Sequence, residues 1–315
     1  MTTMMALRAH MRVGPEVLVY EAARRPEPGI GEVLIQVHAA GITFAELTWD
    51  RTWLRKGVKH APIVPSHEVS GVVVELGSGV VDFQVGDLVF GVIRFDYDGA
   101  AAEYVVAPSA DLAVKPASVP HAVAAALSLA ALTAWQALVV HGRLRRGDRV
   151  LVHGGAGGVG AFAVQLATQL GGHVTTTVRG RDADLVRRLG ADWVLDFAAQ
   201  PAEPLGQGFD IVVDTVGGAV LDASYPVLRP GGRLVSLQSS PSQHRAAQLG
   251  IEAASFVVTP DRFELARLAR LVDRGELRVL IAATFPLHQG RDAFETGSAG
   301  SRRPGKVVLQ VSHPG

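Results

Sequence analysis

A run of glycines after a short apolar segment is the clearest candidate for chemistry in this chain. Residues 151–160 read LVHGGAGGVG and contain a G-x-G-x-x-G spacing. Apolar residues 150–152 predict a strand before the glycines, and residues 161–170 predict a helix after them. In that order the backbone can turn sharply and approach a pyrophosphate at the positive end of the helix, whereas a glycine-rich turn without a ligand is the alternative. The predicted dinucleotide-binding residues of the turn are Gly155, Ala156, Gly157, Gly158, Val159 and Gly160.

The residue that follows the next predicted strand indicates which dinucleotide is bound. Enzymes that use NAD usually place an acidic residue about twenty positions after the glycines, where it binds the ribose hydroxyls. Here the predicted strand 173–178 is followed by Arg179. A guanidinium at this point can pair with a 2′-phosphate through charge-assisted hydrogen bonds. The sequence therefore predicts NADP(H) as the cofactor, and an ordinary exposed arginine is the alternative.

Two different patterns of residues along the chain predict two domains. Residues 1–121 are rich in alternating, β-branched segments separated by Gly and Pro, with strands expected at 33–39, 69–76, 88–92 and 103–107. From residue 122 short apolar runs alternate with helical periods, which predicts a doubly wound parallel sheet and an α/β fold. The apolar segment 306–311 is expected to return to the first domain. The predicted domains are 1–121 with 284–315, a compact β domain that binds substrate, and 122–283, which binds the dinucleotide.

Composition excludes several classes of function. The 315 residues carry 30 basic and 30 acidic side chains, so a net charge of zero argues against a nucleic-acid or anionic-membrane partner. No cysteine is present, which excludes disulfides and thiolate chemistry. Residues 122–140 are uncharged and long enough to span a membrane, but their polar positions favour two short buried helices. Residues 1–13 lack the apolar core of a signal peptide, so we expect a soluble, cytoplasmic protein.

Short motifs over nearly the whole length carry a resemblance to a known family. They include GPEVL at 14–18, HEVSG at 67–71, GDLV at 86–89, LGAD at 189–192, DTVGG at 214–218 and GKVV at 305–308. Together, in this order, they resemble the medium-chain dehydrogenase/reductase superfamily, in its zinc-independent quinone oxidoreductase and enoyl reductase branch. The resemblance implies a GroES-like β domain, a Rossmann domain and an active site in the cleft between them.

The resemblance also bears on metal binding. Zinc-dependent members of the superfamily bind the metal through Cys, His and a further Cys, Asp or Glu. The matching positions here are Thr43, His67 and Leu129, and only His67 can ligate zinc. Because a catalytic zinc needs about three protein ligands, we expect no metal site. His67 is expected either to hydrogen-bond the backbone or to form a polar wall of the substrate site.

The function implied is hydride transfer from NADPH to a quinone or an α,β-unsaturated carbonyl compound, without zinc. The alternatives are a medium-chain alcohol dehydrogenase, an enoyl-thioester reductase, or a catalytically silent nucleotide-binding protein. The partners expected are a small-molecule substrate and a second copy of the chain, paired through an edge strand at 255–258.

Several site residues follow from the resemblance alone. Further contacts to the cofactor are implied for Thr133, Val216, Gly217, Ser236, Leu237, Phe256, Val258 and Lys306. Ordinary structural hydroxyls are the alternative for Thr133 and Ser236. Candidate catalytic residues are Thr43, in a segment where many relatives carry Asn-x-x-Asp, and Tyr97, for which a surface position is the alternative. A substrate pocket is expected from Phe44, Trp49, Trp53, His67 and Phe95, although the aromatic members could equally be core residues.

Overall fold

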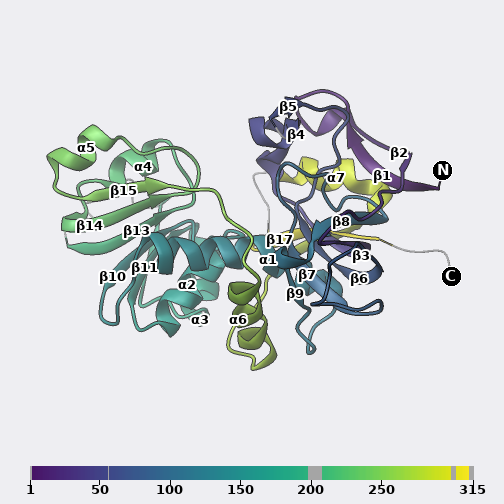
Figure 1. The fold of residues 1–315 in the computed structure, drawn as a ribbon. Helices are drawn as coiled ribbons and strands as arrows, with labels where there is room; N and C mark the ends of the chain where they lie inside the picture. Colours follow the sequence, from purple (N-terminus) through teal and green to yellow (C-terminus); the bar gives the residue numbers. More distant parts are fainter. Residues whose placement is uncertain (1, 56, 198–207, 299–302, 312–315) are drawn as a thin grey trace. The chain divides into compact units, whose positions relative to one another are not determined.

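The computed structural model describes residues 2–55, 57–197, 208–298 and 303–311, and the chain forms two compact units (Figure 1). Unit 1 comprises residues 1–129 and 259–315, and unit 2 comprises residues 130–258. The expected boundaries lay at 121 and 283. The second differs most because the amphipathic helix α6 (Arg262–Asp273) packs on strand β9 (Leu112–Val114) of unit 1. The observed first boundary, between residues 129 and 130, falls within helix α1 (His121–Trp135).

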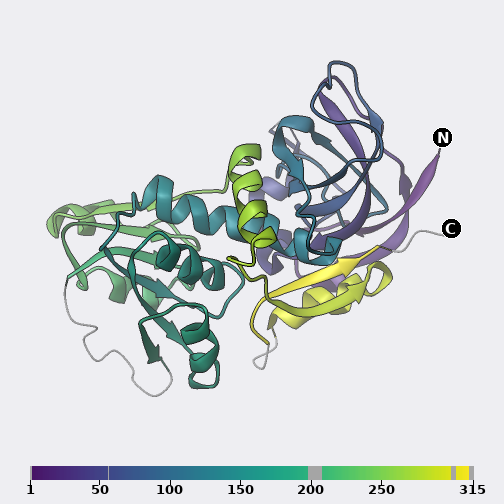
Figure 2. The same ribbon diagram turned by 90° about the horizontal axis from the view of Figure 1, so that it is seen from below.

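Unit 1 is built on a seven-stranded sheet. The strand order is β16-β17-β3-β6-β7-β9, with β8 paired to β3. The bounds are β3 (Glu32–Gly41), β6 (Glu68–Leu76), β7 (Leu88–Val92), β8 (Tyr104–Pro108), β16 (Ile281–Pro286) and β17 (Lys306–Gln310). A separate antiparallel pair joins β1 (Thr3–Ala9) to β2 (Leu18–Arg24), and a short one joins β4 (Leu54–Arg55) to β5 (Val58–Lys59). Helix α7 (Gly290–Glu295) contacts β16 and β17, which lie side by side in Figure 2.

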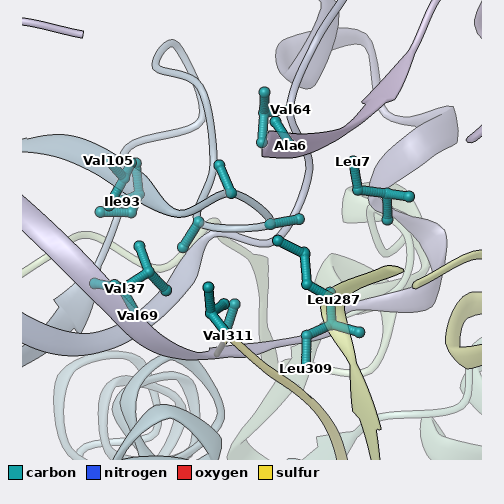
Figure 3. Close-up of a cluster of buried hydrophobic side chains, with 14 of the residues drawn as sticks. Ala6, Leu7, Val37, Val64, Val69, Ile93, Val105, Leu287, Leu309 and Val311 are labelled. Atoms are coloured by element: carbon teal, nitrogen blue, oxygen red, sulfur yellow. The ribbon is translucent and has the colours of Figure 1, made fainter. Parts of the chain in front are cut away.

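Alternation along β3 explains how this sheet makes a core. Ile35 and Val37 are buried, whereas Gln36 and His38 between and after them are half-buried. Side chains of a strand point alternately to its two faces, so the β-branched set covers one face. Figure 3 shows Val37 meeting apolar side chains from segments far apart in the sequence, and the labelled members of this cluster are Ala6, Leu7, Val37, Val64, Val69, Ile93, Val105, Leu287, Leu309 and Val311. The last predicted strand, 306–311, thus does return to unit 1.

Unit 2 is a six-stranded parallel sheet in the order β12-β11-β10-β13-β14-β15. The bounds are β10 (Arg149–His153), β11 (His173–Val178), β12 (Trp193–Asp196), β13 (Phe209–Asp214), β14 (Leu228–Ser236) and β15 (Glu252–Ser255). The helices are α2 (Gly160–Gln169), α3 (Ala183–Arg188), α4 (Ala219–Ser224) and α5 (Gln243–Gln248), and they flank the sheet on both sides (Figures 1 and 2).

The strand order of unit 2 confirms the predicted doubly wound fold. From β10 the chain moves outward to β11 and β12, then returns to β13 and moves outward the other way to β14 and β15. Right-handed crossovers therefore place α2 and α3 on one face and α4 and α5 on the other. The direction reverses between β10 and β13, which is where open α/β sheets bind ligands at the carboxyl ends of the strands.

Two predicted elements differ in the structure. Residues 122–140 form one helix rather than two, because α1 continues directly into a π-helix at Gln136–His141. Among the described residues, this 21-residue helix alone has the length and apolar composition to cross a membrane, but 83% of its most apolar window is buried within the protein, as in a core helix. The edge strand expected at 255–258 lies at Glu252–Ser255 instead; its small and polar residues have low strand propensity and are held by pairing with β14.

Candidate dinucleotide site and buried polar cluster

The glycine turn between β10 and α2 has no room for side chains at two of its three motif positions. A Cβ on Gly160 would lie 2.1 Å from the carbonyl oxygen of Gly154, and one on Gly155 would lie 2.0 Å from Oγ1 of Thr176. One on Gly157 would lie 3.1 Å from the Gly154 oxygen, and Gly154 itself has a φ of +78°. The turn thus brings bare backbone to the first turn of α2, which carries no acidic residue. This arrangement fits a pyrophosphate.

The neighbouring strand ends hold this turn in place. The carbonyl oxygen of Thr177, near the end of β11, accepts hydrogen bonds from the backbone N–H groups of Gly154 at 3.1 Å and Gly155 at 3.2 Å. From the other side, Oγ1 of Thr215 donates to the carbonyl oxygen of His153 at 2.7 Å. The turn is therefore fixed by both neighbours of β10 before any ligand is bound.

Asp214 organises four of the predicted cofactor residues, although sequence reasoning gave it no role. Its carboxylate is fully buried and accepts hydrogen bonds from the backbone N–H of Val216 at 2.9 Å and of Gly217 at 3.0 Å, and from Oγ of Ser236 at 3.3 Å. Its carbonyl oxygen accepts from the N–H of Leu237 at 2.9 Å. The structure thus gathers the ends of β13 and β14 beside the glycine turn. The signal for Asp214 was an acidic residue at the end of an otherwise apolar strand.

Arg179 lies at the same edge of the sheet. It follows β11 directly and precedes the 3₁₀ turn Gly180–Asp182, and its side chain is exposed. Because β10 and β11 are parallel and His153 pairs with Thr177, both strands deliver their next residues to one edge. The position suits recognition of the adenosine ribose, and its role toward the 2′-phosphate stays a prediction.

Three other predicted cofactor residues have contacts of their own. The ring of Phe256 stacks on His141 at a centroid distance of 4.2 Å. Thr133 in α1 and Val258 are both buried. The cofactor roles of these three residues stay predictions.

In unit 1 a buried ion pair sits where β3, β6 and β17 meet. Nζ of Lys306 lies 2.5 Å from Oε1 of Glu68 and donates to the carbonyl oxygen of Ile42 at 2.8 Å. Oγ1 of Thr43 donates to the same Glu68 oxygen at 3.2 Å. Gly41 makes room for the carboxylate, since a Cβ there would lie 2.8 Å from it. The ammonium group of Lys306, for which a cofactor contact was predicted, is thus ion-paired with Glu68. A buried carboxylate needs a nearby positive charge.

A second buried acid, Glu46, lies beside this pair. Its two carboxyl oxygens accept hydrogen bonds from the backbone N–H groups of Ser66 at 3.0 Å and Thr43 at 3.4 Å. Burial, followed by the charge of Glu68, raises the pKa of Glu46 to about 8. Glu46 is therefore protonated at neutral pH and provides a neutral, hydrogen-bonded lining to the cluster.

His67 faces Glu46 with Nε2 at 3.8 Å from Oε2 of the acid. Burial lowers the pKa of His67 to about 4, so the ring is neutral. Within the described part of the chain neither ring nitrogen forms a hydrogen bond; the peptide groups of Ile93 and Arg94 interact with the ring without reaching hydrogen-bond geometry. The ring thus lies against the backbone of Ile93 and Arg94, and both interpretations of His67, the backbone contact and the polar wall, stay predictions.

The predicted pocket residues separate into two groups. The ring of Phe95 lies 4.7 Å from His67 and 5.5 Å from Trp49, so these three side chains do meet. By contrast, Trp53 is buried and its indole N–H donates to the carbonyl oxygen of Leu47, and Phe44 packs against the core of unit 1. The core alternative therefore describes Trp53 and Phe44, and the pocket prediction concerns the other three.

The structure does not bring Tyr97 to Thr43. The Tyr97 hydroxyl donates to Oε1 of Glu32 at 2.9 Å, at the first residue of β3, whereas Thr43 follows the end of that strand. On the order of 30 Å of extended strand separates the two positions along the chain. Burial and the hydrogen bond to Glu32 raise the pKa of Tyr97 to about 12. Both features hold the phenol proton in place, and the predicted donor role gains no support from them.

Comparison with known proteins matches both units. Residues 29–117 match the family described as "Alcohol dehydrogenase GroES-like domain", and residues 189–309 match "Zinc-binding dehydrogenase". The chain is 31% identical over 318 residues to a chloroplastic quinone-oxidoreductase homolog of Spinacia oleracea, covering 94% of this chain and 95% of the relative. The chain belongs to the quinone oxidoreductase branch of the medium-chain dehydrogenase/reductase superfamily.

Two further similarities concern cofactor and substrate. A chloroplastic NADPH-dependent alkenal/one oxidoreductase of Arabidopsis thaliana is 32% identical over 300 residues, covering 90% of this chain and 73% of the relative. A mycobacterial protein solved in complex with NADPH superposes with a TM-score of 0.85 at 32% identity, covering 98% of this chain and 99% of that one. The GroES-like and Rossmann folds expected from the resemblance are thereby confirmed.

The side chains that this protein offers as metal ligands determine whether it can bind zinc. Across the described ranges no group of three or more His, Asp or Glu side chains is arranged to hold a metal ion. Of the three positions that ligate zinc in some members, Thr43 and Leu129 carry a hydroxyl and an alkyl group. A tetrahedral zinc site built on His67 would lack two of its protein ligands.

Proposed function

We propose that this protein is an NADPH-dependent reductase of quinones or α,β-unsaturated carbonyl compounds that works without zinc. The observation that carries the proposal is the glycine turn at the switch point between β10 and β13, with no room for a side chain at Gly155 or Gly160. The relatives named as quinone and alkenal/one oxidoreductases support the substrate class. The wider alternatives, an alcohol dehydrogenase, an enoyl-thioester reductase or a silent nucleotide-binding protein, are outcomes of the test below.

The chain's own residues bind and orient in this scheme. The backbone N–H groups at the start of α2 compensate the pyrophosphate charge, and Arg179 pairs with the 2′-phosphate. NADPH, when bound, supplies a hydride to the electrophilic carbon of the substrate. Trp49 and Phe95 are half-buried and offer aromatic rings on which a planar substrate can stack, and the buried, neutral His67 packs against Phe95. The negative charge that develops on the substrate oxygen is relieved by a proton, which for a quinone can come from water.

The uncharged state of Glu46 and His67 favours the reduction of a quinone or enone over a reaction that needs a buried base. At neutral pH the Glu46 carboxyl is protonated and His67 is uncharged, while the charge of Glu68 is balanced by Lys306. Alcohol oxidation requires a group that removes a proton from the alcohol. With a pKa of about 4 the His67 ring is a weak base, and the Thr43 hydroxyl donates to Glu68. We therefore assign Thr43 to holding Glu68 through its hydroxyl.

The test follows NADPH oxidation by absorbance with a panel of quinones and linear and cyclic enones, and NADP⁺ reduction with primary and secondary alcohols. Isothermal titration of both nucleotides is run in parallel. We expect turnover with quinones or enones and none with alcohols. Tight NADPH binding without turnover on any compound would favour the silent binding protein, and turnover with alcohols alone would favour a dehydrogenase.

A cytoplasmic location and a homodimer complete the proposal. Strand β15 is the last strand of its sheet, and pairing of two copies through its outer edge is a simple way to cover that edge. Light scattering of the purified chain gives the oligomeric state, and fractionation of the native cells gives the location.

A further inference from the structure

A carboxylate lies beside the loop that begins with Arg179. Strands β11 and β12 are parallel, and Val178 pairs with Asp196 at their carboxyl ends. The chain then turns through Gly180, and the carboxylate of Asp196 lies directly over it: a Cβ on residue 180 would be 2.3 Å from Oδ2. Asp196 is half-buried. The glycine thus admits an acidic group to the immediate neighbourhood of the arginine.

This loop faces the same edge of the sheet as the pyrophosphate cradle. Thr177 pairs with His153 and accepts the hydrogen bonds of the glycine turn, so the residues after β11 lie next to the turn. In a doubly wound sheet the adenosine ribose lies over the end of the second strand. Arg179 and Asp196 therefore flank the place where the 2′-substituent of the ribose must lie.

We propose that Asp196 sets cofactor selectivity by opposing Arg179. A carboxylate accepts a hydrogen bond from the 2′-hydroxyl of NADH but repels the 2′-phosphate of NADPH, whereas the guanidinium attracts that phosphate. The two side chains together make a site that accepts either nucleotide, with a moderate preference for NADPH. The inference rests on the proposed function, because it concerns the same nucleotide site.

The test is a set of dissociation constants measured by titration calorimetry on the intact protein. In Asp196→Asn we expect NADPH to bind about tenfold tighter, equivalent to about 1.4 kcal/mol, and NADH to bind equally or more weakly. The fragments 2′,5′-ADP and ADP should show the same divergence without any reaction. The effect should shrink as salt concentration rises, because it is electrostatic.

A matched control separates this local effect from a general loss of negative charge. Asp184→Asn makes the same change on α3, where the carboxylate is exposed and pairs with Arg187 at 2.9 Å. It should leave the ratio of the two dissociation constants unchanged. Asp196→Ser removes the charge with a different side chain and should reproduce the shift, which guards against a folding defect peculiar to the asparagine.

The outcomes distinguish this inference from the proposed function. Failure of the wild-type protein to bind either nucleotide would remove the proposed function and the inference with it. Nucleotide binding and turnover by the wild type, with a ratio that Asp196→Asn and Asp196→Ser both leave within twofold, would overturn the inference alone.

Discussion

The buried acid Glu46 makes the stability of the protein depend on pH in a way that can be worked out from its surroundings. Burial and Glu68 raise the pKa of Glu46, whereas the N–H groups of Ser66 and Thr43 and the charge of Lys306 lower it. Burial has the largest effect, so the pKa of Glu46 rises from its ordinary value of 4.5 to about 8. The folded state therefore holds a proton that the unfolded state has released. The free energy of unfolding must fall as the pH rises through this window.

The magnitude follows from the size of the shift. A difference of one pKa unit corresponds to about 1.4 kcal/mol, so deprotonation of Glu46 costs about 5 kcal/mol over the whole window. Between pH 6.5 and pH 8 the loss contributed by Glu46 alone amounts to about 2 kcal/mol. Three histidines act in the opposite sense around and below pH 6.5, their ordinary pKa, and so offset part of the Glu46 loss between pH 6.5 and pH 8. Burial lowers the pKa of His67, His121 and His153 to about 4, so the unfolded state gains protons there and stability falls with falling pH. Stability should peak near pH 6.5.

Urea unfolding of the wild type and of Glu46→Gln at pH 6.5 and pH 8, followed by tryptophan fluorescence and circular dichroism, measures this loss. Glutamine resembles the protonated acid and cannot ionise, so the variant should lose about 2 kcal/mol less than the wild type over this interval. Glu27→Gln, which changes an exposed glutamate paired with Arg24, should behave as the wild type does. An equal loss in the wild type and Glu46→Gln would show that Glu46 does not hold the proton.

Three further predictions concern the ion pair and the nucleotide site. Lys306→Met leaves the buried Glu68 without its counter-charge and should destabilise the protein by about 3–5 kcal/mol in thermal denaturation, and the double change Lys306→Met with Glu68→Gln should recover part of that loss. Gly160→Val places side-chain atoms against the Gly154 carbonyl and should abolish nucleotide binding in calorimetry while the circular dichroism of the sheet persists. Arg179→Ala removes a charge-assisted hydrogen bond and should weaken NADPH at least tenfold while leaving NADH within about twofold, as measured by fluorescence titration.

The glycine turn and the sheet around it could be predicted because their signals are local. The strand predicted at 173–178 coincides with β11, and the helix predicted at 161–170 differs from α2 by one residue at each end. Apolar runs between glycines and helical periods determine such elements within about ten residues of sequence. Strand β15 was displaced by three residues because its pairing with β14, and not its own composition, decides where it lies.

The buried cluster of unit 1 could not be predicted from local patterns, because its members come from distant parts of the chain. Lys306 and Glu68 are 238 residues apart in sequence and meet only because β17 and β6 both pair with β3. The cofactor contact predicted for Lys306 rested on the family resemblance alone, which carries no information on the partner that Lys306 meets inside unit 1.

A signal for this ion pair was nevertheless present in the sequence. Lys306 opens an apolar strand, and Glu68 opens another apolar strand that was predicted from residue 69. A charge that begins a strand buried on both faces must either reach solvent or find an opposite charge, since an unpaired buried ion costs several kcal/mol. With one cation and one anion in equivalent positions of two strands of the same unit, pairing between them satisfies both. The same reasoning applied to Glu46, on which the charge of Glu68 acts more strongly than that of Lys306, requires protonation instead of pairing, and this is the state that its raised pKa describes.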